Sequence, residues 1–252
     1  MQMGGDVDYD STGHGYASVR RPDPRIAAAI DAALGDARTV VNVGAGAGSY
    51  EPVGRQVLAV EPSAVMRAQR PPGAAIAIHG FAEALPLDDA SVDAAMAVAT
   101  IHQWADRAKG LAEMRRVACG PVVVSAFDGP ALANWWLNDY APELIAAERK
   151  RYPDIEASLA ALGSKVEMRV VPIPIDCTDG FTEAFYARPE RMLDPAVRRA
   201  QSSWGFVDPE VEPRFVAQLS ADLESGRWDE RYGHWRTLPQ YEGSVRLLVG
   251  WP

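Results

Sequence analysis

The segment VVNVGAGAGSYEP, residues 40–52, places three glycines at alternate positions directly behind a short apolar run. Glycine loses more conformational freedom on folding than any other residue, so a cluster of glycines needs a structural reason. Apolar runs of this length are typical of buried strands. The segment therefore predicts a strand that turns sharply at Gly44, Gly46 and Gly48, where a backbone without Cβ atoms approaches a ligand closely. A tight turn that holds no ligand is the alternative.

Strand-like and helix-like patterns alternate around this segment. Strands are predicted at residues 38–43, 56–62, 74–80, 91–100 and 120–127. Helices are predicted at residues 22–34, 63–70 and 105–118. Such alternation predicts an α/β fold, in which helices cover both faces of a mostly parallel sheet.

The pattern changes after Phe127. Helical segments are predicted at residues 131–152, 154–163 and 178–235, the last with many aromatic residues, and further strands at residues 166–175 and 244–251. The chain has no internal repeat and no low-complexity linker, so we expect a single domain over residues 1–252. In this interpretation residues 1–21 form a polar arm, and insertions at about 130–162 and 178–235 form a helical cap.

Charge and composition disfavour several classes of protein. The net charge of the 252-residue chain is -9 and its basic residues are scattered, which disfavours nucleic acid or an anionic membrane surface as a partner. No apolar run approaches the length of a membrane span, and we expect no secretory signal. The two cysteines, Cys119 and Cys177, lie far apart, which fits a reducing cytoplasm. The four histidines, at positions 14, 79, 102 and 234, lack metal-ligand spacing, so we expect no metal.

Glu61 adds a second signal to the glycines. It follows the next predicted strand, 17 positions after Gly44. In dinucleotide-binding folds a carboxylate at this place accepts hydrogen bonds from ribose hydroxyls, so the pair indicates an adenosine-containing ligand. The glycine spacing is G-x-G-x-G, and residues 49–56 form a poor helix. NAD and ATP are therefore disfavoured, because no helix N-terminus is available for their phosphates. A solvated acid at a strand end is the alternative for Glu61.

Four stretches together resemble a known family. They are VVNVGAGAGSY, VLAVEPSAVMRAQRP, HGFAEALPLDDASVDAAMAVATIHQWAD and EMRRVACGPVVVSAF. In this order they are similar to the class I S-adenosylmethionine (SAM) dependent methyltransferases, and most of all to small-molecule enzymes of the ubiquinone-biosynthesis and trans-aconitate type. The resemblance covers about residues 38–127. The segment YASVRRPDPRI is similar to the family's leading segment, whereas the cap matches only loosely.

The resemblance implies a Rossmann-like, seven-stranded sheet with an antiparallel last strand. It also implies SAM as cofactor, S-adenosylhomocysteine (SAH) as product and a small-molecule acceptor. The implied SAM-binding residues follow the family's motifs along the chain: Gly44, Ala45, Gly46 and Gly48 beside methionine and ribose, Glu61 at the ribose hydroxyls, Ser63 and Met66 near the adenine, Ala82 and Glu83 at its edge, and Val98 and Ala99 under the sulfonium.

Asn42 departs from the family's pattern. The family usually has an acidic residue here, which helps to hold the SAM amino group. Asparagine keeps a hydrogen bond but removes the charge, so the resemblance implies weaker binding or a second residue at the amino group.

The acceptor and the chemistry are less well specified. Methyl transfer from a sulfonium mainly requires alignment and exclusion of water. His102 follows the fourth strand and titrates near neutrality, so it is a candidate base, and Tyr16 on the arm is a second candidate catalytic residue. Packing beneath the cofactor is the alternative for His102. Arg20 closes over SAM, pairs with an acidic acceptor or is solvated. Aromatic residues of the cap are further candidates for acceptor binding, with the cap's own core as the alternative: Trp136, Tyr140 and Tyr186.

The sequence therefore predicts a cytoplasmic, monomeric or homodimeric SAM-dependent methyltransferase with a small-molecule acceptor. Three other functions stay open. The first is non-methyl chemistry on SAM, such as intramolecular cyclisation of its aminobutyrate arm, to which the uncharged Asn42 gives mild support. The second is a nicotinamide-dependent oxidoreductase, which the glycine spacing disfavours. The third is a non-catalytic SAM-binding partner protein.

Overall fold

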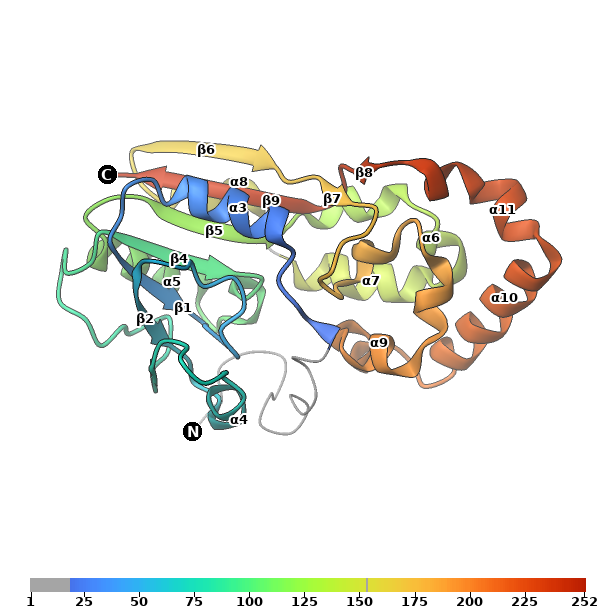
Figure 1. Ribbon diagram of the computed structural model, residues 1–252, viewed down its shortest axis with the longest axis horizontal. Coiled ribbons are helices and arrows are strands. Elements are labelled where there is room, and N and C mark those ends of the chain that lie inside the picture. Colours follow the sequence, from blue (N-terminus) through green and yellow to red (C-terminus); the bar gives the residue numbers. More distant parts are fainter. Residues whose placement is uncertain (1–18, 153) are drawn as a thin grey trace.

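The computed structural model describes residues 19–152 and 154–252 of the chain. A twisted sheet with its helices forms one part of the molecule, and a mostly helical lobe lies beyond one end of it (Figure 1). Most of the predicted arm, with Tyr16, lies outside the described residues. Within the described residues no helix is both long and apolar enough to span a membrane.

The main sheet has seven strands in the order β3-β2-β1-β4-β5-β9-β6. Its strands are β1 (Thr39–Val43), β2 (Gln56–Val60), β3 (Ala77–Ile78), β4 (Ala94–Val98), β5 (Val122–Phe127), β6 (Lys165–Val170) and β9 (Val245–Trp251). The last strand, β9, runs antiparallel to both of its neighbours, β5 and β6, and the other pairs are parallel. The predicted fold is thereby confirmed.

The central strands are apolar because both of their faces are covered. On β1, Val40 faces one core cluster together with Ile26 and Ile30 of helix α3 (Pro24–Ala33). The next residue, Val41, faces the opposite cluster, which includes Leu111 of helix α5 (Arg107–Val117). This alternation places α3 on one face of the sheet and α5 on the other.

Two short helices complete this part. Ser63 caps α4 (Ala64–Ala68) by accepting a hydrogen bond from the Met66 amide. Helix α8 (Ile155–Ala160) packs against α5, β6 and β9. The predicted cap segment 130–162 therefore differs from the structure at its end, because α8 covers the sheet. The physical reason is that its apolar side chain Ile155 joins the α5 core cluster.

The helical lobe consists of five helices, short 3-10 turns and a two-stranded sheet. Its elements are α6 (Leu137–Tyr140), α7 (Pro142–Arg151), α9 (Pro195–Arg199), α10 (Val211–Ser225), α11 (Arg227–Tyr232), β7 (Ile173–Pro174) and β8 (Gln240–Tyr241). Trp136, Phe215 and Trp228 are buried at its centre, and this cluster is continuous with the one beneath α3. The lobe therefore has its own aromatic core, fused to one face of the sheet.

Candidate functional site

The glycine turn directly follows β1. Gly44, Gly46 and Gly48 have φ values of +69°, +52° and +91°, in the left-handed region that side chains disfavour. A Cβ atom at Gly44 would also collide with the Thr100 side chain. No helix forms between β1 and β2, as expected from the poor helical pattern of this stretch. The turn therefore offers a closely approachable backbone, without a helix N-terminus for a phosphate.

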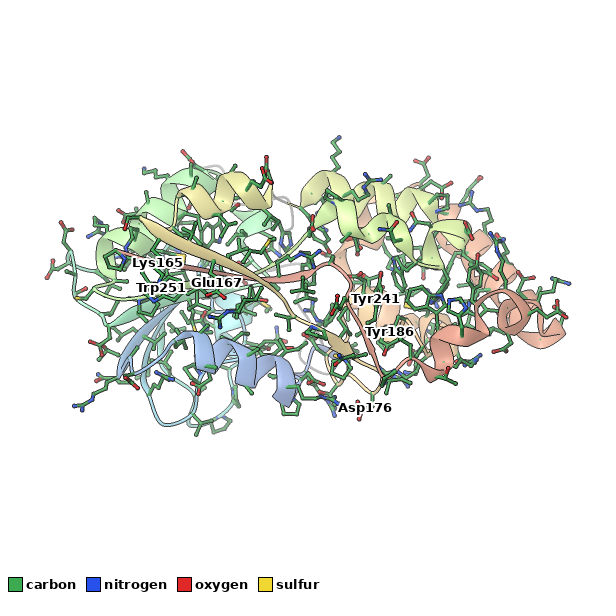
Figure 2. All side chains as sticks on the ribbon, turned by 90° about the horizontal axis from the view of Figure 1, so that it is seen from above. Lys165, Glu167, Asp176, Tyr186, Tyr241 and Trp251 are labelled. Carbon is green, nitrogen blue, oxygen red and sulfur yellow. The ribbon has the colours of Figure 1, made fainter. Side chains whose placement is uncertain are left out.

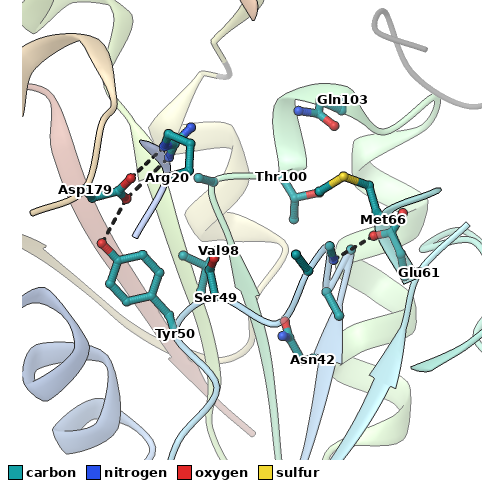
Figure 3. A pocket seen from close by; sticks show the side chains of 15 residues that line it. Arg20, Asn42, Ser49, Tyr50, Glu61, Met66, Val98, Thr100, Gln103 and Asp179 are labelled. Carbon is teal, nitrogen blue, oxygen red and sulfur yellow. Dashed lines mark hydrogen bonds and ion pairs between the residues drawn. The ribbon is translucent and has the colours of Figure 1, made fainter. Parts of the chain in front are cut away.

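Glu61 closes this turn from the end of β2. Its Oε2 accepts a hydrogen bond from the Gly46 amide at 2.8 Å (Figure 3), and its Oε1 accepts one from the Ser63 amide at 2.8 Å. The residue is only 7% exposed. Burial raises the pKa of the Glu61 carboxyl, and the two amide hydrogen bonds act in the opposite direction. Each carboxylate oxygen keeps a lone pair for one further donor.

A pocket opens between the glycine turn and the end of β4. We call it the glycine-turn pocket (Figure 3). It brings together eight residues predicted to bind SAM: Asn42, Gly44, Ala45, Gly46, Glu61, Met66, Val98 and Ala99. Its lining also includes Arg20 and six residues that the sequence motifs did not indicate: Ala47, Ser49, Tyr50, Thr100, Gln103 and Asp179. Thr100 and Gln103 follow β4 directly, so the rule that ligands bind at carboxyl ends of strands could have found them.

Four predicted SAM-binding residues lie outside this lining. Ser63 caps α4, and Gly48 lies against the guanidinium of Arg70. Glu83 accepts a hydrogen bond from the Asp106 amide at 3.1 Å, and Ala82 packs in the α5 core cluster. Gly48 and Ser63 lie next to residues of the lining, and the role of all four residues in SAM binding stays a prediction.

Asn42 lies at the floor of the pocket and contacts a charged pair. Its Nδ2 donates to Glu51 Oε1 at 3.1 Å, and Glu51 in turn pairs with Arg70 at 2.6 Å. Both charged side chains are largely buried, with 11% and 6% of their surface exposed. The carboxylate of Glu51 therefore lies next to Asn42. The family that the sequence resembles usually has its own carboxylate at the position of Asn42 itself.

The rim of the pocket joins the N-terminal segment to the lobe. Arg20 pairs with Asp179 at 2.6 Å, and the Tyr50 hydroxyl donates to the same carboxylate at 2.9 Å. Burial raises the pKa of Tyr50 far above its usual range, so its hydroxyl stays protonated. The structure thus places Arg20 at both the pocket and the lobe, with an acidic partner from the chain itself.

A second, smaller pocket lies beside the first, and we call it the lobe pocket. The two share Arg20, Ala99 and Gln103. The rest of its lining comes from the 3-10 turn after β4, the end of β5, the end of α7 and two segments of the lobe: His102, Phe127, Glu148, Arg151, Tyr152, Phe181, Thr182, Gln201, Ser202 and Ser203. Among these residues, His102 is the one named above as a candidate from the sequence.

His102 faces the lobe pocket from the 3-10 turn after β4. Its ring meets the edge of Tyr152 at 5.5 Å, and Tyr152 stacks on Phe127 at 5.0 Å. Gln103 Nε2 lies 3.3 Å from His102 Nε2. Because an amide nitrogen only donates, this contact fits an imidazole whose Nε2 accepts. An imidazole with an accepting nitrogen can take up a proton from a bound molecule.

The three cap aromatics predicted to bind the acceptor lie elsewhere. Trp136 donates its Nε1 proton to the Tyr186 carbonyl at 2.9 Å, and Tyr140 donates to Asp222 at 2.8 Å. Tyr186 lies beside Tyr241, with ring centroids 5.4 Å apart (Figure 2). All three are buried in the lobe's core and line neither pocket, so the structure does not bring them to this site, and their role in acceptor binding stays a prediction. A helical lobe of this size needs large side chains to fill its own interior.

Metal ligands do not gather in the described part of the chain. No group of three or more histidine, cysteine, aspartate or glutamate side chains there could hold a metal ion.

Comparisons with known proteins point to one family. The family model for a methyltransferase domain matches residues 41–120. A solved structure from Anabaena variabilis, assigned as a methyltransferase from an antibiotic biosynthesis pathway, is 31% identical with a TM-score of 0.86. That alignment covers 92% of this chain and 99% of the Anabaena chain.

Two more distant structures share the fold. A SAM-dependent methyltransferase from Thermotoga maritima is 18% identical, with a TM-score of 0.52 over 88% of this chain and 85% of its own. The cyclase SpnF is 15% identical, with a TM-score of 0.53 over 96% of this chain and 93% of its own. No match was found among curated proteins. The ubiquinone and trans-aconitate subtype stays a prediction. The Anabaena relative is matched over nearly its whole length, and the family model spans the glycine turn, Glu61 and the end of β4, so the chain belongs to the class I SAM-dependent methyltransferases.

Proposed function

We propose that this protein transfers the methyl group of SAM to a small-molecule acceptor, with SAM in the glycine-turn pocket and the acceptor in the lobe pocket. The observation that carries the proposal is that the two pockets share Arg20, Ala99 and Gln103. A donor and an acceptor bound in them would meet at the end of β4. Bringing two reactants together in this way is the main task in a methyl transfer.

The lining of the glycine-turn pocket suits the parts of SAM. Glu61 has one free lone pair on each oxygen for the two ribose hydroxyls. The backbone of Gly44 and Gly46 admits close contact, Met66 gives an apolar surface for the adenine, and Ala99 lies where the sulfonium would be. When bound, SAM supplies a methyl group that is already activated by its positive sulfur.

The lobe pocket is where the remaining residues would act. If the acceptor must lose a proton, His102 would take it up. The ion pair of Arg20 with Asp179 would keep water away from the place where the two pockets meet. The presence of a second pocket favours transfer to another molecule. Intramolecular cyclisation of SAM and non-catalytic SAM binding would both need only the first pocket.

Calorimetry with SAH tests the assignment of the first pocket. Glu61→Ala removes the acceptor for both ribose hydroxyls, and loss of such hydrogen bonds costs about 1.5–3 kcal/mol of binding free energy. Glu167→Ala, which removes an exposed carboxylate on the edge strand β6, is the control and should bind SAH as the unchanged protein does. Equal SAH affinity in Glu61→Ala and the unchanged protein would sink the proposal.

A second measurement separates methyl transfer from chemistry on SAM alone. We expect SAM to stay intact when it is incubated with the protein and no acceptor. Mass spectrometry that detected 5′-methylthioadenosine formed by the protein would instead show cleavage of the aminobutyrate arm.

A further inference from the structure

Glu148 is a buried carboxyl with an unused oxygen. It lies on the last turn of α7, is only 2% exposed and lines the lobe pocket. Its Oε1 accepts a hydrogen bond from Thr182 Oγ1 at 2.6 Å. Its Oε2 is buried and has no hydrogen-bond partner among the residues that the structure describes. Buried polar atoms are normally paired, so an unpaired carboxyl oxygen facing a pocket calls for an explanation.

Polar side chains surround the Glu148 carboxyl on one side. Burial raises the pKa of its carboxyl, while the hydroxyls of Thr182 and Ser203 and the charge of Arg151 act in the opposite direction. Arg151 also donates to the Ser203 hydroxyl at 3.0 Å. Thr182 holds Oε1, and no residue in the described part of the chain makes a hydrogen bond to Oε2.

Three aromatic residues also line the lobe pocket. Phe127 stacks on Tyr152, and its ring lies 5.6 Å from that of Phe181. All three residues line the pocket. A ligand there would meet flat apolar surfaces along its body and a hydrogen-bond acceptor at one end.

We propose that Glu148 Oε2 selects the methyl acceptor, by accepting a hydrogen bond from a hydroxyl or amine group on a small molecule with a flat, apolar body. This inference rests on the proposed function, because it assigns the lobe pocket to the acceptor. A site built to bind an O–H or N–H group rejects an analogue without it, since its own buried polar atom is then left unpaired. Glu148 is thus a specificity-determining residue, and Thr182 and Ser203 position it.

Binding of small probes to the SAH-saturated protein tests this proposal. Phenol carries the hydroxyl, aniline carries the amine, and toluene has the same shape without a strong donor. Ligand-observed NMR titrations should show that phenol or aniline binds roughly tenfold or more tightly than toluene. Whichever of phenol and aniline binds more tightly identifies the hydrogen-bond donor, hydroxyl or amine, that the pocket prefers.

Glu148→Gln is the matched variant. It preserves the Thr182 contact through its carbonyl and places an amide donor at the position of Oε2. This donor can bind the phenol oxygen but cannot accept from the aniline N–H, so the preference for aniline over toluene should fall to near parity. Glu143→Gln, on the exposed side of the same helix, should retain the preference of the unchanged protein.

The outcomes separate this inference from the proposed function. If SAH binds but phenol, aniline and toluene bind equally well to the unchanged protein, the role of Glu148 is wrong while SAM binding stands. A preference for aniline over toluene that survives in Glu148→Gln also overturns it. If SAH fails to bind, the proposed function fails first. Should Glu148→Gln not fold, the comparison of the three probes on the unchanged protein still decides.

Discussion

Asn42 has a fixed orientation, because its neighbour can only accept hydrogen bonds. The Glu51 carboxylate accepts a hydrogen bond from the amide nitrogen of Asn42. The carbonyl oxygen of Asn42, which Figure 3 shows among the pocket-lining side chains, is therefore the atom left for a ligand in the glycine-turn pocket. A carbonyl oxygen suits the ammonium group of SAM. We infer that Asn42 and Glu51 together take the place of the acidic residue that is usual in the family.

Substitution of Glu51 tests this arrangement. Glu51→Gln no longer fixes the Asn42 amide and removes a nearby negative charge, so SAH should bind about 3–10-fold more weakly, the equivalent of one ordinary hydrogen bond. 5′-Methylthioadenosine lacks the amino group and should bind as it does to the unchanged protein. Calorimetry with both ligands checks this. Equal weakening of both would show that Glu51 and Arg70 merely hold the glycine turn together.

His102 carries the second prediction at the scale of single residues. If it takes a proton from the acceptor, His102→Ala should lower turnover by roughly 10²–10⁴ while SAH affinity barely changes. The rate is measured with any acceptor that the unchanged protein methylates. His79→Ala, at an exposed histidine after β3, is the control. Loss of SAH binding in parallel with turnover would instead indicate that His102 packs beneath the cofactor.

At the scale of elements, the glycine turn depends on what surrounds each glycine. Gly44 and Gly54 both have left-handed φ values, +69° and +84°. Alanine in this region costs about 1–2 kcal/mol in either place. A Cβ at Gly44 also collides with Thr100, whereas one at Gly54 meets nothing within 4 Å.

Gly44→Ala should therefore lower the free energy of unfolding by about 1–3 kcal/mol more than Gly54→Ala, since overpacking adds to the backbone strain. Urea unfolding of the two variants checks this difference. We also expect Gly44→Ala to lose SAH binding and Gly54→Ala to retain it. Equal unfolding free energies would mean that Thr100 moves aside without cost.

The elements of the sheet could be predicted because their local signals agree. The run at residues 38–43 is apolar on both faces, as a central parallel strand requires, and Asp23 and Ser63 each cap a helix near the predicted start. The glycine turn and Glu61 were predicted from spacing along one chain segment. Signals that depend on residues close together in the sequence, such as these, do not require knowledge of the tertiary fold.

The lobe pocket could not be predicted in the same way. Its lining comes from separate segments that only the tertiary fold brings together, such as Glu148 on α7 with Thr182 and Ser203 from later turns. One signal was present: Glu148 lies three and four positions after Ile145 and Leu144, so it falls on the apolar, buried side of its helix. A charged residue on the buried side of a helix indicates a functional site more clearly than the aromatic residues that fill the lobe's core.

At the scale of the whole molecule, buried contacts join the lobe to the sheet. Glu183, in a turn of the lobe, accepts hydrogen bonds from the backbone amide and hydroxyl of Ser244, directly before β9. Arg246 on β9 pairs with Asp128 after β5 at 2.9 Å. Because the lobe and the α3 face also share one apolar cluster, we expect the two parts to unfold together.

Glu183 makes this junction sensitive to pH. Burial raises the pKa of Glu183 from 4.5 to about 7, the Ser244 hydrogen bonds oppose the shift, and the carboxyl of Glu148 adds to it. The folded state therefore holds a proton that the unfolded state releases above about pH 4.5. Its contribution to stability is present below that pH and is lost as the pH rises through about 7.

The last prediction is that unfolding becomes easier between about pH 5 and pH 8, with Glu183 accounting for about 3 kcal/mol of the free energy of unfolding. Glu183→Gln stays neutral and should flatten this dependence, leaving the slope that other groups such as Glu148, whose pKa burial also raises, give in the same direction. Urea unfolding at several pH values checks both proteins, with the exposed Glu242→Gln as control. An unchanged slope in Glu183→Gln would mean that Glu183 is ionised in the folded protein, and that the junction tolerates a buried charge.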